Sequence, residues 1–135
     1  MSRWRFVRFA VDVLRTGSVK GLSQSTVNHV GKEWSTTMLT KALVVKLTAK
    51  DDTREEVAAF LAGAVDLANQ EEGTVLWLAL RTDDSTFWIV DAFANDAGRQ
   101  AHLDGPIAAA LMEHADRLLA LPPEIMPADA LATKP

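Results

Sequence analysis

The chain has 135 residues, of which 48% are hydrophobic and 24% are charged, and this length corresponds to one domain. The apolar fraction is typical of a globular protein and excludes a disordered one. No apolar run approaches the ~18–20 residues that a membrane-spanning helix needs. Cysteine is absent, which excludes disulfides, thiolate metal sites and cysteine nucleophiles. The chain has three histidines, which are few for a histidine-rich metal site.

The net charge of −4 is unevenly distributed along the chain. Residues 1–37 are basic, with a net charge of +4, whereas the remaining residues carry −8. An acidic body does not suit nucleic acid, since affinity for nucleic acid comes largely from phosphate neutralisation. We therefore expect no nucleic-acid partner, no membrane partner and a cytoplasmic location.

A change in composition near residue 38 divides the chain into two segments. Residues 1–37 are rich in arginine, serine and threonine, and apolar residues recur at helical spacing within residues 1–15. Three explanations of this basic N-terminal extension stay open: a targeting peptide, a basic surface arm, or dispensable sequence upstream of a true start at Met38. Residues 38–135 form the predicted folded domain.

The first regular elements after Met38 are a strand and an amphipathic helix. Residues 41–49 are apolar and β-branched, which predicts a strand. Thr53 and Glu56 have the spacing of a capping box, so we expect the threonine hydroxyl to cap the helix. Gly73 predicts a left-handed exit after the helix. The helix should bury one apolar stripe, made of Val57, Phe60, Leu61, Ala64, Val65 and Ala68.

A β-hairpin is predicted over residues 74–94, with residues 82–85 as its turn. We expect Arg81 to face Thr86 across the hairpin. One face would then carry Leu76, Leu78, Leu80, Phe87, Ile89, Asp91 and Phe93. The other face would carry Val75, Trp77, Ala79, Arg81, Trp88, Val90 and Ala92. Both faces are strongly apolar, whereas a face exposed to solvent should be polar.

Two helices and an edge strand complete the predicted fold. Asn95 or Asp96 should cap a short helix that runs to about Leu103, and Pro106 suits the first turn of a second helix. That helix has its own apolar stripe, made of Ile107, Ala110, Leu111, His114, Ala115 and Leu118. Residues 125–132 predict a last strand at a sheet edge, because they contain proline. The resulting order, β-α-β-β-α-β, is that of a ferredoxin-like α+β sandwich.

The face that bears Trp77 and Trp88 would be left without helices in such a sandwich. One buried tryptophan covers about 150–250 Å², so two of them approach the largest apolar patch of a typical monomer. We expect this face to pack on the same face of a second copy, forming a homodimer, a dimeric α+β barrel. The alternative is that residues 1–37 fold back over the sheet.

The segment FWIVDAFANDAGRQAHLDGPIAAAL, residues 87–111, resembles the antibiotic biosynthesis monooxygenase (ABM) domain, which includes quinol monooxygenases. The family pattern is an acidic residue, one spacer, an aromatic residue and a histidine nine positions later, here Asp91, Phe93 and His102. Residues 71–81 and 127–134 look like the family's second and last strands. The family commonly has glutamate and tryptophan at the first two positions. The strand asparagine of haem-degrading relatives is missing between residues 38 and 52, which weakens a haem-binding interpretation.

His102 and Asp91 are the candidate catalytic residues of a pocket between helices and sheet. An unperturbed histidine pKa of about 6.5 suits a general base, although a helix-end histidine bonded to the backbone is equally compatible with the sequence. A buried carboxylate such as Asp91 needs a partner. It could cap backbone amides, meet Arg99 or Arg117, or orient a substrate hydroxyl or a histidine. The predicted substrate-binding wall consists of Leu76, Leu78, Phe87, Ile89 and Phe93.

The resemblance implies a cofactor-independent monooxygenase that acts with dioxygen on a quinol or polycyclic phenol. Such a reaction needs a dry apolar cavity and a base, and no metal or flavin. His102 and His114 match no metal-site spacing, and His114 falls on an apolar stripe, where a core role is expected. The alternative function is a non-catalytic dimeric module that binds a small molecule or serves a stress response.

Overall fold

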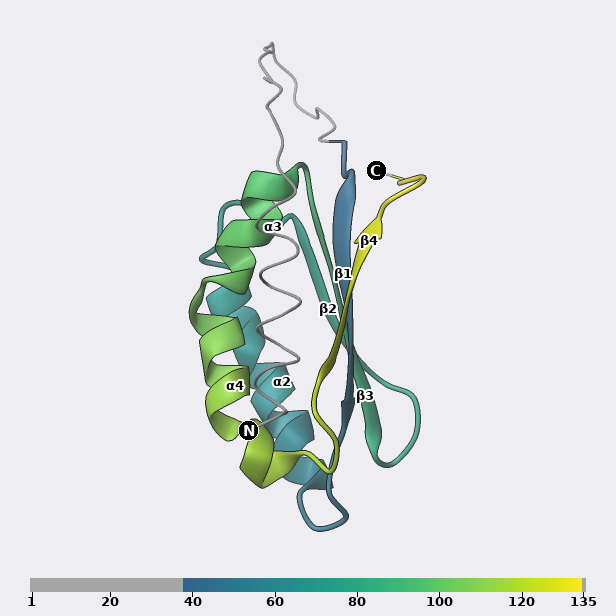
Figure 1. Cartoon of the computed structure of the whole chain (residues 1–135), viewed down its shortest axis with the longest axis vertical. Helices are drawn as coiled ribbons and strands as arrows, with labels where there is room; N and C mark the ends of the chain where they lie inside the picture. The colour runs from purple at the N-terminus through teal and green to yellow at the C-terminus, as the bar shows by residue number, and fades with distance from the viewer. Residues whose placement is uncertain (1–37, 135) are drawn as a thin grey trace.

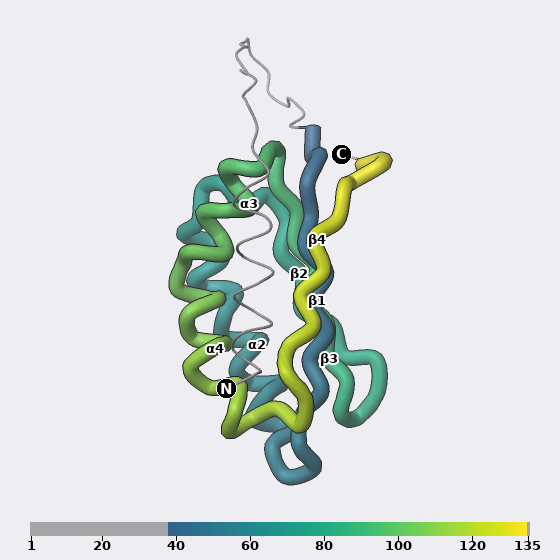
Figure 2. The backbone as a smooth tube through the Cα atoms, viewed as in Figure 1, coloured from purple at the N-terminus to yellow at the C-terminus, as the bar shows by residue number. Residues whose placement is uncertain are grey.

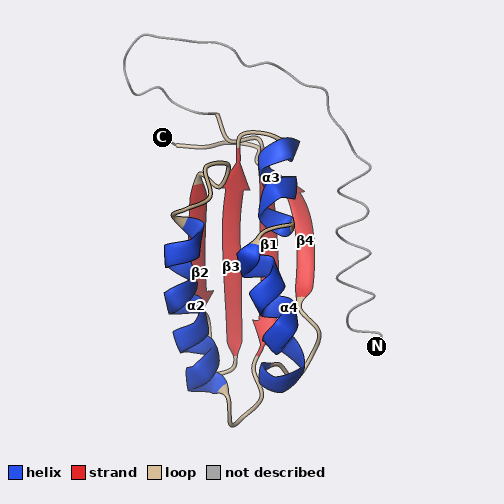
Figure 3. Ribbon diagram, turned by 90° about the vertical axis from the view of Figure 1, so that its left-hand side faces the viewer, coloured by secondary structure: helices blue, strands red, loops and turns tan. Residues whose placement is uncertain are grey.

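A four-stranded antiparallel sheet with helices on one face forms the body of the chain (Figures 1 and 3). The computed structural model describes residues 38–134, so the predictions for residues 1–37 lie outside the described residues. The strands are β1 (Lys41–Thr48), β2 (Leu76–Arg81), β3 (Thr86–Phe93) and β4 (Glu124–Asp129). The helices are α2 (Arg54–Ala68), α3 (Asp96–Leu103) and α4 (Pro106–Leu118). The strand order β2-β3-β1-β4 confirms the ferredoxin-like α+β fold.

The central strand β1 pairs with β3 on one side and with β4 on the other. Its alternate residues Leu43, Val45 and Leu47 are buried beneath the helices, as the period of two requires. Both ends of the described chain lie at the same end of the sheet, where Ala130 N–H donates to the carbonyl of Thr40 (Figure 2). Among the described residues, no helix has the length and apolar character needed to cross a membrane.

The predicted helices are present, and each buries most of its predicted stripe. α2 buries Val57, Leu61, Ala64 and Ala68, and α4 buries Ile107, Leu111, Ala115 and Leu118. Val65, which was placed on the α2 stripe, is instead exposed. Pro106 occupies the first turn of α4, and Pro127 lies in the edge strand β4, as predicted.

The hairpin register differs by one residue from the prediction. Arg81 pairs with Phe87 rather than with Thr86. Since side chains alternate along a strand, this single step moves every β2 side chain to the opposite face of the sheet. Trp77 therefore packs beneath the helices against the core, whereas Leu76 and Leu78 lie on the helix-free face. The prediction that Trp77 and Trp88 share one face was wrong.

The helix-free face remains apolar with the observed register. One row across the sheet consists of Leu78, Val90, Val44 and Met126. The adjacent row is Leu80, Trp88, Lys46 and Glu124, so it is apolar on β2 and β3 and charged on β1 and β4. Leu76, Leu78 and Leu80 are 39%, 44% and 45% exposed. We call these residues, together with their row neighbours, the open sheet face.

Two local predictions about α2 were wrong. Thr53 makes no side-chain cap; its hydroxyl donates to the carbonyl of Leu118 at 2.6 Å and so ties the start of α2 to the end of α4. Gly73 has no left-handed backbone. A Cβ at Gly73 would lie 2.9 Å from the Cα of Gly98, so close backbone approach is what requires glycine there.

Candidate functional site

Three titratable side chains meet between the sheet and α3. Asp91 points from β3 toward the helices, and His102 comes from the last turn of α3. Glu71 comes from the loop between α2 and β2. Asp91 Oδ2 lies 2.9 Å from His102 Nε2, and Glu71 Oε1 lies 2.6 Å from His102 Nδ1. The imidazole is thus held between two carboxylates, and we call this group the triad.

Burial and charge set the protonation of the triad. Asp91 and His102 are 1% and 6% exposed. Burial raises the pKa of the Asp91 carboxyl, although the neighbouring imidazole lowers that pKa in part. Burial lowers the pKa of His102, but contacts with Asp91 and then Glu71 outweigh it, so the pKa of His102 is raised above 6.5. The triad therefore holds a proton on His102 more tightly than an isolated histidine would.

Several buried polar atoms at this place lack hydrogen-bond partners among the described residues. They are both carboxylate oxygens of Asp91, Glu71 Oε2 and the Trp77 indole Nε1, although Asp91 Oδ2 lies within ion-pair distance of His102 Nε2. Trp77 and Asp91 are directly opposite each other in the β2–β3 pairing, and both face the helices. A buried donor or acceptor without a partner costs about 1–3 kcal/mol, so a polar group that reached these atoms would be bound favourably.

Local contacts fix α3, and with it His102. The side chain of Asn95 accepts a hydrogen bond from Gly98 N–H, which caps the helix as predicted. The buried Arg99 donates to the carbonyls of Ala42 and Ala128 and to Asp96, which anchors α3 to the sheet. Because these groups occupy Arg99, it is not the partner of Asp91.

The structure shows which of the predicted side-chain partners Asp91 contacts. Arg117 pairs with Glu56 on the surface, so neither predicted arginine meets Asp91. Asp91 instead contacts His102, so the histidine is the partner that the structure provides, and a role in orienting it stays a prediction. His114 is half-buried and packs edge-on against Phe60, with ring centroids 5.9 Å apart, which agrees with a packing role.

The predicted substrate-binding wall is divided by the hairpin register. Phe87, Ile89 and Phe93 are on the helix-facing side with Asp91, and the Phe93 ring lies 5.6 Å from the His102 ring, centroid to centroid. Leu76 and Leu78 lie on the open sheet face, so they do not belong to this wall. Trp77 lies on the helix-facing side instead of these leucines. The predicted register, which was wrong by one residue, had assigned Trp77 to the opposite face.

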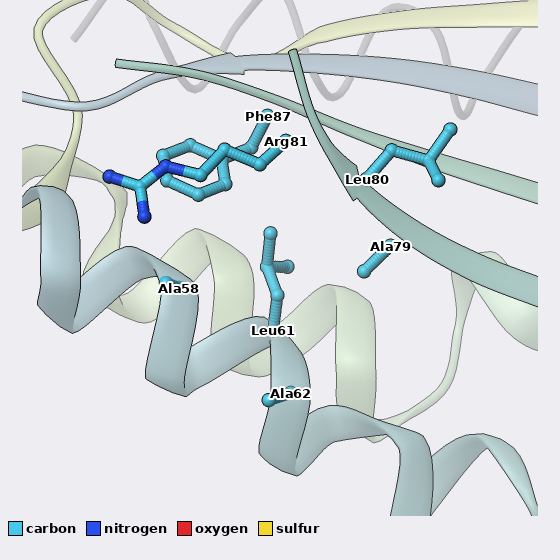
Figure 4. A pocket seen from close by; sticks show the side chains of 7 residues that line it. All are labelled: Ala58, Leu61, Ala62, Ala79, Leu80, Arg81 and Phe87. Carbon is cyan, nitrogen blue, oxygen red and sulfur yellow. The ribbon is translucent and has the colours of Figure 1, made fainter. Parts of the chain in front are cut away.

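Two apolar pockets flank α2. The first holds about 150 Å³ between α2 and the hairpin, where Leu61 points toward the strands and the Arg81 guanidinium lies 5.0 Å from the Phe87 ring centroid (Figure 4). The second, which we call the α2–α4 groove, holds about 190 Å³. It is lined by Phe60, Gly63, Ala64, Leu67, Ile107 and Ala110. Trp77 packs against the buried cluster of Ala64, Ala68 and Ile107, two of whose members line this groove.

Glu71 is the site residue that the sequence did not identify. It precedes β2 in a polar loop, 31 positions before His102, and no local pattern distinguishes it from the neighbouring Glu72. Within residues 38–134, no group of three or more histidine and acidic side chains is arranged to hold a metal ion.

Comparisons with known proteins agree with this architecture. A solved structure of the NE2512 protein of unknown function from Nitrosomonas europaea is 52% identical, with a TM-score of 0.71, and the match covers 73% of this chain and 96% of that one. A "putative antibiotic biosynthesis monooxygenase" from the same organism shares the fold at 16% identity and a TM-score of 0.63, covering 68% and 99% of the two chains. Another with that description, from Chloroflexus aurantiacus, matches at 18% identity and a TM-score of 0.57, covering 71% and 97%. No protein-family model matches the chain, and neither does any curated protein.

Proposed function

We propose that this chain, which belongs to the same family as the NE2512 protein of Nitrosomonas europaea, is an ABM-type oxygenase that oxidises a quinol or phenol with dioxygen. The observation that carries the proposal is the buried triad, in which the Asp91 Oδ1 atom is left without a hydrogen-bond partner among the described residues. The fold shared with the two proteins described as monooxygenases supports the same reaction class.

The triad supplies the proton transfer that such a reaction needs. A substrate hydroxyl would donate to Asp91 Oδ1, and the Asp91–His102 pair would take the proton when His102 is neutral. Glu71 keeps the imidazole in place through Nδ1. The phenolate formed in this way passes one electron to dioxygen, which is the oxidant, and the resulting phenoxyl radical and superoxide combine through a new ring C–O bond. Protonation gives a hydroperoxide, whose O–O bond breaks with loss of one water to leave the second oxygen atom on the ring as a quinone. Phe87, Ile89 and Phe93 keep water away from the reacting hydroxyl.

Oxygen uptake by the purified protein tests this proposal. We expect uptake with members of a panel of quinols that is unchanged by a chelator, and a loss of about 100-fold or more in His102→Gln, since general-base catalysis typically contributes that much. The rate should rise with pH through a midpoint above 6.5, because the base must be neutral and its pKa is raised. Uptake by His102→Ala at the rate of the unsubstituted protein would contradict the proposed role.

A second function, binding without turnover, is favoured by the burial of the triad. Asp91 is 1% exposed, and the two pockets hold about 150 and 190 Å³, below the range of about 300–1,000 Å³ usual for drug-sized ligands. On this account the protein is a small-molecule-binding module. A thermal shift with a phenol and no oxygen uptake with any quinol would support it.

A homodimer through the open sheet face is part of the proposal. The row Leu78–Val90–Val44–Met126 is a continuous apolar surface that no described helix covers. Burying it against a second copy removes this surface from water, which stabilises the dimer by about 25 cal/mol for each Å² of apolar surface buried. The interface that we propose is the sheet face that carries Trp88 and the β2 leucines. Trp77, which was expected on this face, lies on the opposite face of the sheet.

A further inference from the structure

We infer that residues 1–15, the beginning of the basic N-terminal extension, dock in the α2–α4 groove of the same chain as an amphipathic helix. The groove lies between two helices, on the side of the molecule away from the open sheet face. Two features of the described residues point to this occupant: the apolar lining of the groove, and acidic side chains on both of its borders. The triad takes no part in this docking, and neither does the proposed oxidation.

The α2–α4 groove offers an apolar surface between antiparallel helices. The start of α2 is tied to the end of α4 through Thr53, and a Cβ at Gly105, before α4, would lie 3.1 Å from Glu71 Oε2, after α2. On α2 the groove extends from Phe60 to Leu67, a length of about 11 Å. Its volume of about 190 Å³ holds one or two large side chains, so a docked helix would lie along the opening and insert them.

Acidic side chains border the groove on both helices. Asp66 comes three residues after Gly63, and Glu113 comes three residues after Ala110, so each shares a helix face with a residue that lines the groove. Both are exposed, and neither has an ion-pair partner among the described residues. Ion pairs at exposed positions contribute little affinity, but they select the sign of the charge that binds. The borders therefore favour a basic segment.

The sequence of residues 1–15 predicts a helix that fits both features. On a helical wheel Arg5, Arg8 and Arg15 lie on the side opposite the apolar residues, and long arginine side chains can reach past the edge of a helix. A single helix of this length is only marginally stable in water, so packing on the body would stabilise it. The apolar side contains Phe6, Val7, Phe9, Ala10, Val13 and Leu14.

The groove is within reach of the extension. Near the beginning of the described chain, the Thr40 hydroxyl donates to the carbonyl of Ala94 at 2.7 Å, just before α3. From there α3 extends for about 12 Å and leads to Ile107, which lines the groove. Residues 16–37 connect the two parts and can span up to about 70 Å. Such a tether raises the effective concentration of the segment at the groove.

The open sheet face is the less favourable site for the same segment. Its row beside Leu78 carries Lys46, whose Nζ lies 5.8 Å from the Trp88 ring centroid. An arginine-rich helix placed there would meet a like charge, whereas at the groove it meets Asp66 and Glu113. Charge therefore favours the groove.

Limited trypsin digestion of the full-length protein, followed by mass spectrometry, tests the inference. Trypsin cleaves after Arg8 and Arg15 within the segment and after Lys20 beyond it, so each digestion contains its own reference. Cleavage within the segment follows its undocked fraction when docking is fast. We expect Gly63→Lys to raise the rate after Arg8 and Arg15, relative to Lys20, by about 10-fold, because a charge in the groove opposes burial of apolar side chains.

Ala62→Lys is the matched control for this variant. It makes the same charge change at the neighbouring residue of α2, but Ala62 lines the other pocket, so the relative rate should stay that of the unsubstituted protein. Gly63→Lys should fold, since a Cβ at Gly63 would have no atom within 4 Å and lysine suits a helix better than glycine.

A second pair of variants tests the acidic borders. Asp66→Lys/Glu113→Lys should raise the relative cleavage rate by about 5-fold, because it replaces two attractions by two repulsions. Asp52→Lys/Asp84→Lys makes the same change of net charge at exposed positions in the β1–α2 loop and the hairpin turn. It should leave the relative rate unchanged.

Three results would overturn the inference. Equal relative rates in all variants would show that the groove does not hold the segment, and if only added phosphatidylglycerol vesicles then slowed cleavage, a membrane surface would be the partner. Rates raised by Leu78→Glu and not by the groove variants would assign the segment to the open sheet face. Protection that disappears on dilution would assign it to the groove of a second copy. Oxygen uptake enters none of these results, so they are independent of the proposed function.

Discussion

The chemistry of the site depends on how one imidazole is shared by two carboxylates. A buried histidine alone would lose its proton easily, and a buried aspartate alone would gain one. Placing His102 between Asp91 and Glu71 reverses the first tendency, so the positive charge of the imidazolium is stabilised by its neighbours. His102, the predicted general base, is therefore a stronger base than an ordinary histidine, and a larger fraction of it is protonated at a given pH.

We predict that Asp91→Asn lowers the pKa of His102 more than Glu71→Gln does. Asp91 makes the larger of the two contributions that raise this pKa, while the burial that lowers it remains in both variants. Titration of the His102 ring by NMR measures the pKa directly. An equal pKa in all three proteins would show that the carboxylates do not control the imidazole.

The same pKa shifts predict a pH dependence of stability. His102 has a raised pKa in the folded state, so its stabilising contribution is complete below about pH 6.5 and is lost as pH rises through the folded pKa. The raised pKa of Asp91 acts in the same direction at lower pH, since the folded state retains protons that the unfolded state releases. The free energy of unfolding, measured by urea denaturation, should fall as pH rises above 6.5, and it should fall less in the double variant His102→Gln/Asp91→Asn. If the free energy of unfolding fell equally steeply with pH in both proteins, His102 and Asp91 would not be the source of the pH dependence.

At the level of elements, the contact between the α2–β2 loop and the first turn of α3 brings the triad together. A Cβ at Gly98 would lie 2.9 Å from the carbonyl oxygen of Gly73, and a Cβ at Gly73 would be equally close to Gly98. Only glycine at both positions lets the two backbones approach. Since Glu71 lies two residues before Gly73, this approach sets its distance from His102.

We predict that Gly98→Ala destabilises the fold by about 1–3 kcal/mol, the usual cost of overpacking, because the atom that the new Cβ meets is the backbone carbonyl oxygen of Gly73. It should also lower the pKa of His102 by moving Glu71 away. Gly63→Ala is the matched control, and since its Cβ meets no atom it should stabilise α2 by about 0.5–1 kcal/mol. Chemical denaturation of both variants provides the comparison, and equal stabilities would show that the glycine contact is dispensable.

At the level of the whole molecule, one side of the sheet is covered by helices and the other is apolar and exposed. Leu76, Leu78 and Leu80 present their side chains there, beside Trp88. Packing this face on a second copy is the arrangement that removes the most apolar surface from water with a single two-fold interface.

We predict that Leu78→Glu converts the proposed dimer to a monomer, since it places a charge at the β2 end of the apolar row. Val65→Glu is the control, because Val65 is similarly exposed, at 40%, but lies on α2, on the helical side of the molecule. Light scattering on both variants and on the unsubstituted protein measures the mass. A monomeric unsubstituted protein, or a dimeric Leu78→Glu, would contradict the proposed interface.

The sequence by itself determined the elements, their order and two members of the triad. The helices repeat apolar residues at a helical period, and Asn95 and Pro106 mark where α3 and α4 begin. Asp91 and His102 could be recognised because one is a charge within an apolar strand and the other fits a family pattern of fixed spacing. These features are local, and local sequence encodes them.

Only the tertiary structure decided which face each β2 residue occupies and which residues complete the site. The segment LWLALR, β2, is apolar on both faces, so its side chains cannot indicate the register, and a shift of one residue exchanges Trp77 with its leucine neighbours. Glu71 and His102 are 31 positions apart, and they meet because the backbones of Gly73 and Gly98 pack together. Contacts of this kind are set by how elements pack in three dimensions, which the periodicity of a single strand or helix does not specify.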